Sequence, residues 1–295
     1  MIEVKNFSKQ FDADTYAVSD LSFSVASGEI FAFLGANGSG KTTTIRTLLG
    51  IYEPDDGALL IQGRPYDTDQ AVLTGYLPEE RGLYKQSRAQ ETLEYFARLK
   101  GVSKNEATKR ARDYLERVGL MDKAYTEIKH LSSGQQQKIQ LGTAVINNPE
   151  LLILDEPTKG LDPVNRQLLM DLLLERNNHG ATVVFITHQL EEVERIADKV
   201  MIIKDGKRQV YGAVNQVKQS YGDHTVHIRY SGNIPAETEL FSATIKRRQA
   251  ELTPKDGVNS EDILRWLLDQ DITVTDFRMG APSLEEIFIR VYDED

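Results

Sequence analysis

The sequence predicts an α/β protein with a mostly parallel central sheet, followed by a smaller α+β domain. Three short, uninterrupted apolar runs predict the sheet, at residues 30–34, 151–154 and 182–187, and a helical pattern follows each of them. Such runs are typical of strands buried on both faces, and strands that alternate with helices build parallel sheets. A change of composition near residues 211–221 marks where the smaller domain is expected to begin.

The composition is that of a folded protein without thiol chemistry. Of 295 residues, 40% are hydrophobic and 27% are charged, an ordinary globular balance. The absence of cysteine excludes disulfides, thiol catalysis and zinc–thiolate sites, and it fits a reducing compartment. The net charge of −10 argues against a nucleic-acid partner, because affinity for the phosphate backbone comes largely from Lys and Arg.

The chain is not expected to enter a membrane by itself. Its N-terminal residues lack the charged-then-apolar pattern of a signal segment. The longest apolar stretches, such as 151–154 and 183–186, are far shorter than the roughly 20 residues that span a bilayer.

Two further regions are expected within residues 1–215. Near the N-terminus, Leu21, Phe23 and Val25 alternate with small or polar residues, which predicts half-buried strands of an antiparallel β-subdomain. From residue 86 to 120 apolar residues recur with a helical period, and we expect a helical subdomain over about 86–140.

The C-terminal domain is expected to span residues 216–295. Predicted strands lie at 226–230, near 243–252 and at 272–277, with a helix opened by residues 259–262. Residues 283–286 form a capping box before an apolar helix. His224 and His227 are interpreted as surface residues of one strand that point to opposite faces, and therefore not as a metal pair.

A glycine-rich loop after the first apolar run matches the phosphate-loop pattern GxxxxGK[ST]. Backbone N–H groups of such a loop and the positive end of the following helix face phosphate oxygens. We expect Lys41 to reach the β- and γ-phosphates of ATP and the Thr42 hydroxyl to bind Mg²⁺. An ordinary glycine turn would not be framed by a buried strand and a helix, so the core is expected to be a P-loop (RecA-like) sheet. The expected nucleotide-binding residues here are Gly35, Asn37, Gly38, Ser39, Gly40, Lys41, Thr42 and Thr43.

Two carboxylates follow the apolar run 151–154. Asp155 is expected to bind Mg²⁺, and Glu156 is expected to polarise the water that attacks the γ-phosphate. Alone, a strand that ends in Asp-Glu is most often a strand entering a loop. The phosphate loop elsewhere in the chain favours the functional interpretation.

The segment Leu131-Ser132-Ser133-Gly134-Gln135 resembles the LSGGQ signature of ABC ATPases, with Ser133 in place of the first glycine. The resemblance extends over residues 1 to about 215. Residues 159–162 resemble the family's D-loop and His188 its switch histidine, whereas alone His188 would be a strand-end histidine bonded to a carbonyl. Phe11 lies where the family keeps an aromatic residue that stacks on adenine, and a core position is the alternative.

This resemblance implies a head-to-tail homodimer or heterodimer of nucleotide-binding subunits. Ser132, Gly134 and Gln135 of one subunit would then cap the ATP that the phosphate loop of the other holds. It also implies separate transmembrane permease subunits, so the chain would lie peripherally at the cytoplasmic face of the cell membrane.

The sequence departs from the family pattern at two further positions. Glu79 occupies the place of a Gln that touches Mg²⁺ and the attacking water, and it is therefore a candidate metal ligand and catalytic residue whose charge Arg81 could offset. Lys159 replaces the Ser that is common in the D-loop. The surrounding segment and the stretch 282–286 resemble a bacterial branch of sodium-export (NatA-like) and drug- or peptide-resistance subunits, which implies an exporter.

Two other classes share parts of this pattern. DNA-maintenance ATPases of the SMC kind insert long coiled coils between the phosphate loop and the signature, whereas here only residues 43–130 separate them. ABC proteins that act as translation factors resemble two cassettes in tandem, and this chain has one phosphate loop. The transporter ATPase remains the leading hypothesis.

Overall fold

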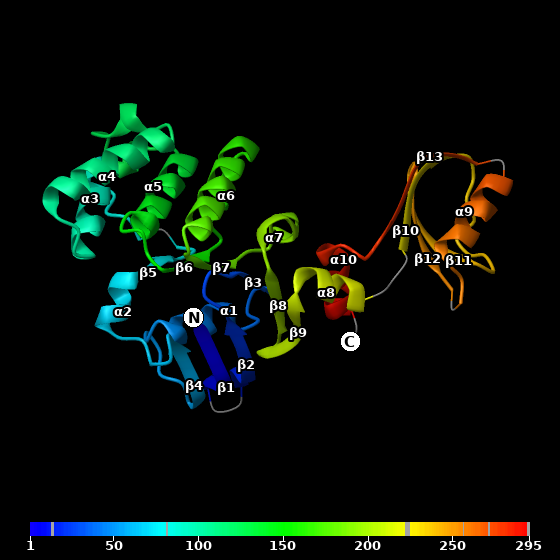
Figure 1. Cartoon of the computed structure of the whole chain (residues 1–295), viewed down its shortest axis with the longest axis horizontal. Coiled ribbons are helices and arrows are strands. Elements are labelled where there is room, and N and C mark those ends of the chain that lie inside the picture. The colour runs from blue at the N-terminus through cyan, green and yellow to red at the C-terminus, as the bar shows by residue number, and fades with distance from the viewer. Residues whose placement is uncertain (13–14, 81, 222–224, 256, 271, 294–295) are drawn as a thin grey trace. The chain divides into compact units, whose positions relative to one another are not determined.

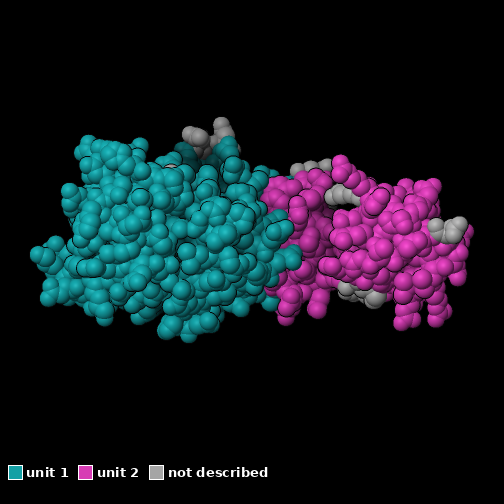
Figure 2. All heavy atoms as spheres, turned by 90° about the horizontal axis from the view of Figure 1, so that it is seen from above, with its two compact units in different colours: residues 1–213 teal, residues 214–295 magenta. Residues whose placement is uncertain are grey.

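The computed structural model divides the chain into two compact units, residues 1–213 and 214–295 (Figure 2). It describes all residues except 13–14, 81, 222–224, 256, 271 and 294–295. Each unit has its own hydrophobic core, and the predicted α/β fold class is confirmed.

A six-stranded sheet with the order β5-β6-β7-β3-β8-β9 forms the centre of the first unit (Figure 1). All its neighbouring pairs are parallel except β8 with β9. Strands β3, β6 and β7 are buried along their whole length, as their uninterrupted apolar runs predict. The strands are β3 (Ile30–Leu34), β5 (Thr74–Leu77), β6 (Leu151–Asp155), β7 (Thr182–Ile186), β8 (Lys199–Lys204) and β9 (Lys207–Ala213).

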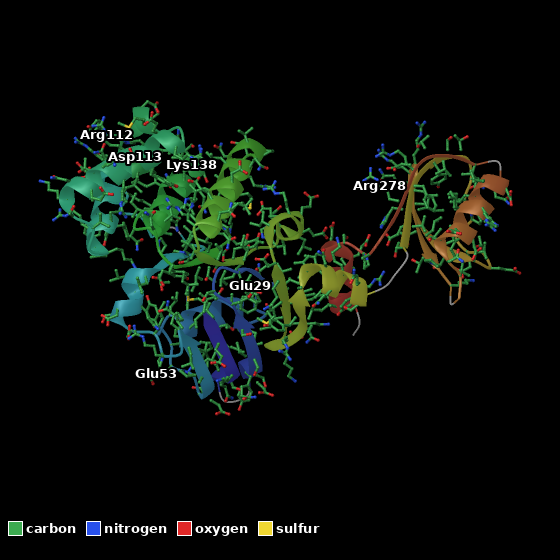
Figure 3. All side chains as sticks on the ribbon, viewed as in Figure 1. Glu29, Glu53, Arg112, Asp113, Lys138 and Arg278 are labelled. Carbon is green, nitrogen blue, oxygen red and sulfur yellow. The ribbon has the colours of Figure 1, made fainter. Side chains whose placement is uncertain are left out.

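An antiparallel sheet with the order β2-β1-β4 packs beside this core (Figure 1). Its strands are β1 (Ile2–Asp12), β2 (Thr15–Val25) and β4 (Asp56–Ile61). The rings of Phe23 and Phe31 stack with centroids 5.5 Å apart and join β2 to β3. Glu29, labelled in Figure 3, pairs at 2.8 Å with Lys199 and ties the beginning of β3 to that of β8.

Helices make up the rest of the first unit. The continuous helical pattern predicted over 86–120 is interrupted in the structure, because Gly101 takes a left-handed φ of 84° and ends the first helix. No helix in the described part of the chain is long and apolar enough to cross a bilayer. The helices are α1 (Lys41–Leu48), α2 (Thr68–Leu73), α3 (Ala89–Leu99), α4 (Lys104–Arg117), α5 (Ser133–Val145), α6 (Pro163–Asn178) and α7 (Leu190–Ile196).

In its described residues, the second unit is a four-stranded antiparallel sheet with the order β11-β12-β10-β13 and three helices. Ile263 and Leu267 of one helix are fully buried in a core with Val226 and Phe241 of the sheet. The elements are α8 (Val214–Ser220), β10 (Thr225–Ser231), β11 (Phe241–Lys246), β12 (Gln249–Pro254), α9 (Ser260–Asp269), β13 (Thr273–Gly280) and α10 (Leu284–Asp293).

The prediction of one strand near residues 243–252 is wrong. The structure has a hairpin there, with Lys246 opposite Gln249 and Arg247 at a left-handed φ of 54°. Glycine and asparagine are the residues that usually signal such a turn, and neither occurs at this point of the sequence. The sequence pattern therefore did not predict this turn.

Candidate functional site

A cavity of about 350 Å³ opens at the carboxyl ends of the central strands. Most of the side chains expected to bind and hydrolyse a nucleotide meet there, although they come from four separate segments of the chain. The lining residues are Asn37, Gly38, Gly40, Lys41, Thr42, Thr43, Glu79, Asp155, Glu156, Lys159, Ile186 and His188.

The phosphate loop connects β3 to α1 and requires glycine at two points of close approach. Gly40 has a φ of 105°, and a Cβ atom there would lie 2.6 Å from the carbonyl oxygen of Ala17. A Cβ atom on Gly35 would lie 2.4 Å from Ser39 Oγ. With no side chains at these points the loop turns tightly, and Lys41, Thr42 and Thr43 at the start of α1 line the cavity. The first N–H groups of a helix have no acceptor within it, so they can bind an anion.

Lys41 lies across the phosphate loop. Its Nζ donates hydrogen bonds to the carbonyl oxygens of Gly35 and Ala36, both at 2.8 Å. Burial lowers the pKa of this ammonium group, while the nearby carboxylates of Asp155 and Glu156 act in the opposite direction. A partly desolvated ammonium held over anion-binding N–H groups is suited to bind phosphate oxygens.

The carboxylates in the cavity form a cluster of three. Asp155, at the end of β6, is only 4% exposed. Burial raises its pKa to about 6, and the neighbouring charges of Glu79 and Glu156 add to the effect. Oxygen ligands with excess negative charge, beside the Thr42 hydroxyl, match the preference of a hard divalent cation. The donor set therefore fits Mg²⁺.

Glu156 follows Asp155 in an unusual backbone conformation. Its φ of 49° is left-handed, which a residue with a side chain rarely adopts, and its N–H donates to Ile186 O at 2.8 Å. His188 Nδ1 lies 2.9 Å from Glu156 Oε2, an ion-pair distance without the alignment of a hydrogen bond. His188 Nε2 lies 3.0 Å from the side-chain amide nitrogen of Gln189, which can only donate, and this contact favours the tautomer with the ring proton on Nδ1.

Two glutamines of α5 hold both acidic loops, and sequence reasoning missed them. Gln137 Nε2 donates to Pro157 O at 3.1 Å. Gln140 Nε2 donates to Pro78 O at 3.0 Å and Glu80 O at 3.2 Å, on either side of Glu79. The signal available in the sequence was two glutamines spaced three apart. That both are buried is a finding of the structure.

Glu192 of α7 is a third residue that the sequence reasoning missed. It is buried behind the cavity, where burial raises its pKa. The Thr158 hydroxyl donates to its Oε2 at 3.1 Å, and Arg166 Nε lies 3.3 Å from its Oε1. Glu192 thus supports the loop that follows Glu156, and it does not line the cavity itself.

Glu79 and Lys159 are in direct contact. Lys159 Nζ donates to Glu79 Oε1 at 2.7 Å, and both side chains line the cavity. Arg81, expected to offset the charge of Glu79, lies outside the described residues. The cation that the structure places against Glu79 is Lys159.

The signature residues lie outside this cavity in the described chain. Ser132 and Gln135 form a capping box at the start of α5, since Ser132 N donates to Gln135 Oε1 at 2.9 Å and Gln135 N to Ser132 Oγ at 3.3 Å. A Cβ atom on Gly134 would lie 3.7 Å from Gly160 O, so the signature packs close to the D-loop of its own chain.

Phe11 also lies outside the described lining of the cavity. It is 54% exposed, and its ring meets that of Tyr52 edge-on at 5.3 Å. The core alternative for Phe11 is therefore wrong, and its ring is accessible for stacking.

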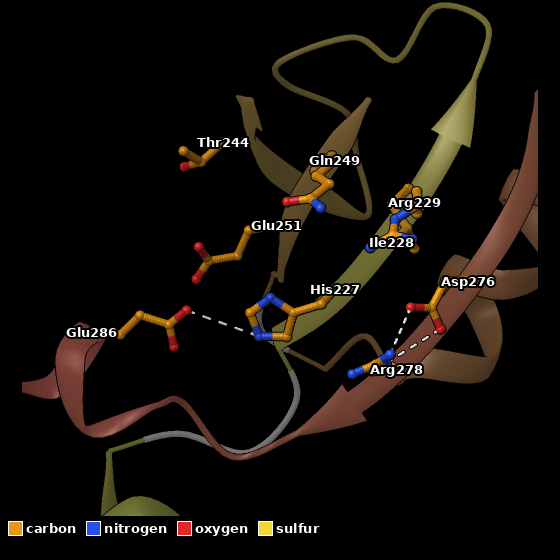
Figure 4. A pocket seen from close by; sticks show the side chains of 10 residues that line it. His227, Ile228, Arg229, Thr244, Gln249, Glu251, Asp276, Arg278 and Glu286 are labelled. Carbon is orange, nitrogen blue, oxygen red and sulfur yellow. Dashed lines mark hydrogen bonds and ion pairs between the residues drawn. The ribbon is translucent and has the colours of Figure 1, made fainter. Parts of the chain in front are cut away.

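A second cavity, of about 430 Å³, lies in the C-terminal unit (Figure 4). His227 points into it with Glu251 and Glu286, and one ligand atom of each lies within 4.8 Å of the others. His224 lies outside the described residues, and the two carboxylates near His227 come from β12 and α10. Glu286 Oε2 accepts from Ser283 N at 2.8 Å, in the capping box expected at 283–286, while Oε1 stands 3.9 Å from His227 Nε2.

Comparison with known families gives two matches that together span most of the chain. Residues 18–159 match the ABC transporter family, and residues 212–292 match the C-terminal domain of DrrA1-3-like ATP-binding proteins.

Individual relatives agree with these matches over nearly the full length. The uncharacterized ABC transporter ATP-binding protein YhaQ of Bacillus subtilis is 36% identical over 98% of this chain and 97% of its own. The linearmycin resistance ATP-binding protein LnrL of the same organism is 35% identical over 99% of this chain and 98% of its own.

A solved structure extends the similarity to the fold. The ATP-binding cassette MJ0796, in a dimeric post-hydrolysis state bound to ADP and Pi, superposes with a TM-score of 0.66 at 27% identity. The match covers 72% of this chain and 98% of that cassette.

Proposed function

The chain belongs to the ATP-binding proteins of ABC transporters and is an ATPase, and on this basis we propose that it is the motor of an exporter. In this proposal it works as a head-to-tail dimer at the cytoplasmic face of the membrane, on separate permease subunits. The similarity to LnrL, a linearmycin resistance protein, supports export of a drug- or peptide-type cargo, with sodium as the alternative cargo.

One observation carries the proposal: a phosphate loop and an acidic strand end meet in a single cavity. Lys41 and the N–H groups at the start of α1 would hold the β- and γ-phosphates of ATP. Phe11 would stack on the adenine ring.

Thr42 and Asp155 would hold Mg²⁺, with Glu79 as a third oxygen ligand. When bound, the ion supplies positive charge that offsets the charge on the phosphate oxygens. Asp155 is prepared for this role because a buried carboxylate with a raised pKa gains most from a nearby cation.

Glu156 is the proposed general base. Its carboxylate would take the proton of the water that attacks the γ-phosphate. His188 Nδ1 lies 2.9 Å from the same carboxylate, and this contact would help to orient it toward the water.

The second half of the site would come from a partner copy. Within one chain, Ser132, Gly134 and Gln135 lie outside the cavity, so they remain available to contact ATP held by another subunit. The dimeric state of the related MJ0796 cassette supports this arrangement. Loss of the γ-phosphate removes an interaction made only in the closed dimer, and the dimer opens.

Glu156→Gln tests the base and the dimer together. The amide keeps the shape of the side chain but cannot accept the proton, so we expect hydrolysis to fall by about 10²–10⁴-fold. ATP then persists between two subunits, and size-exclusion chromatography with ATP and Mg²⁺ is expected to show a stable dimer. Hydrolysis at the wild-type rate would exclude Glu156 as the base.

Lys41→Ala is the matched control. Without the ammonium group the variant is expected to lose binding of a fluorescent ATP analogue and to stay monomeric under the same conditions. Undiminished binding would overturn the assignment of the phosphate loop. Purification with ribosomes or DNA, in place of a membrane protein, would contradict the transporter function.

A further inference from the structure

We propose that Lys159 is a positioning residue that forms an ion pair with Glu79 beside the phosphate loop. The pair has no net charge, and another cation can replace Lys159 in it. Lys159 neutralises the Glu79 carboxylate while the nucleotide binds, and yields it when a divalent cation arrives. This inference rests on the proposed function of the cavity, and it concerns two residues that each depart from the family pattern.

The contact follows from the order of the strands. Glu79 lies in the loop after β5 and Lys159 in the loop after β6, and β5 and β6 are parallel neighbours. Their carboxyl ends therefore meet at the same edge of the sheet, which brings together two residues 80 positions apart at 2.7 Å.

The backbone holds both partners in place. The side chain of Gln140 bonds the carbonyl oxygens on both sides of Glu79, and Lys159 N donates to Glu156 O at 3.1 Å. The two side chains are 58% and 48% exposed, so their ion pair is screened and weak. Exchange of the ammonium group for another cation is therefore inexpensive.

The ion pair reduces the negative charge of the cavity. Without Lys159, Glu79 would add a third negative charge to Asp155 and Glu156 where a triphosphate has to bind. The pKa of Lys159 is raised chiefly by its hydrogen bond to Glu79, with Glu156 and Asp155 contributing from further away. Lys159 therefore interacts most strongly with Glu79, and the Glu79 side chain is exposed enough to bind another cation in place of Lys159.

Neutralising Glu79 and yielding it to a cation predict opposite effects of Lys159→Ala on nucleotide affinity and on Mn²⁺ affinity. Without a divalent cation the unpaired Glu79 repels phosphate, and nucleotide affinity should fall by about three- to tenfold, as expected for one charge near the surface. In the nucleotide complex the same unpaired carboxylate is free for a cation, so Mn²⁺ should bind more tightly than in wild type.

The experiment is a double-mutant cycle on the full chain. A fluorescent ADP analogue is titrated in EDTA into wild type, Lys159→Ala, Glu79→Gln and the double variant, and Mn²⁺ binding to each ADP complex is followed by electron paramagnetic resonance. We expect Glu79→Gln to restore the affinity of Lys159→Ala to within about twofold of wild type, and Lys159→Arg to behave as wild type.

Two results would overturn the proposal. An equal loss of affinity from Lys159→Ala with and without Glu79→Gln would mean that Lys159 contacts the nucleotide itself. Unchanged Mn²⁺ affinity in Lys159→Ala would exclude the exchange. Lys41→Ala separates these from failure of the proposed function, because wild-type binding by that variant would invalidate the site as a whole.

Discussion

Asp155 is suited to bind a cation, but its charge lowers the stability of the folded protein. It is 4% exposed and lies beside two other carboxylates, so its charge is unfavourable in the nucleotide-free protein. A cation bound at the site would remove this cost. Glu156, with its left-handed backbone, adds a second local strain at the same place.

Asp155→Asn is expected to stabilise the nucleotide-free protein. The folded pKa of about 6 exceeds the usual value near 3.9, so the folded state binds more protons between pH 4 and 6. The contribution of Asp155 to stability therefore decreases as pH rises through this window and is constant above it. Above pH 6 the variant should gain about 1–3 kcal/mol over wild type, measured by urea unfolding.

The pH series carries its own control. The gain should shrink toward zero near pH 4, where Asp155 is protonated in the folded protein. Asp122→Asn changes an exposed carboxylate that does not line the cavity. It should leave the unfolding free energy unchanged at every pH. A gain for Asp155→Asn that is the same from pH 4 to 8 would refute the argument.

At the scale of elements, α5 links the signature to both acidic loops. Its first residues carry the signature and its cap, whereas Gln137 and Gln140 reach the loops that present Glu156 and Glu79. A shift of this helix would move the side chains of the cavity as well. We propose that contact of a partner subunit with the signature would be transmitted through α5 to the cavity.

Gln140→Ala tests this link. Two carbonyl oxygens beside Glu79 lose their donor, which should cost about 1–2 kcal/mol of stability and leave the Glu79 loop less well positioned. We expect the Mg²⁺ concentration for half-maximal ATPase activity to rise severalfold, with nucleotide affinity in EDTA almost unchanged.

Gln136→Ala is the matched control for this measurement. It removes the same amide from the same helix, but within the described residues its Nε2 donates to the carbonyl oxygens of Ile128 and Leu131, which precede the signature. An equal change of Mg²⁺ dependence in both variants would show that the effect is not specific to Gln140.

For the whole molecule, we propose that the two compact units are separate domains. The core of the first unit includes Phe31 and Phe33 of the central sheet, and that of the second includes Phe241 and Leu267. The chain has one tryptophan, Trp266 in α9, and its ring meets Phe241 at 5.1 Å. Its fluorescence therefore reports on the second unit alone.

Addition of ADP to the full chain should distinguish separate domains from one cooperative unit. At 100 times its dissociation constant the nucleotide stabilises the unit that binds it by about 2.7 kcal/mol. In thermal unfolding we expect the far-ultraviolet circular dichroism transition of the first unit to move upward, while the Trp266 transition stays in place. Equal shifts of both would contradict separate domains, and Lys41→Ala should show neither shift.

The local elements of this protein could be predicted because their residues are neighbours in the chain. The strand, loop and helix around Lys41 and the acidic end of β6 each lie within a few consecutive residues, and backbone rules act over that distance. The hairpin at Arg247 is also local, but it was missed because no glycine or asparagine at its turn indicates the positive φ.

The sequence by itself determined the phosphate loop, the carboxylates of Asp155 and Glu156, and the two departures at Glu79 and Lys159. Only the tertiary structure decided that these two departures form one ion pair, and that Gln140 holds the loop of one of them. The contact depends on β5 lying beside β6. Strand order arises from packing over the whole sheet, and a local sequence pattern therefore does not predict it.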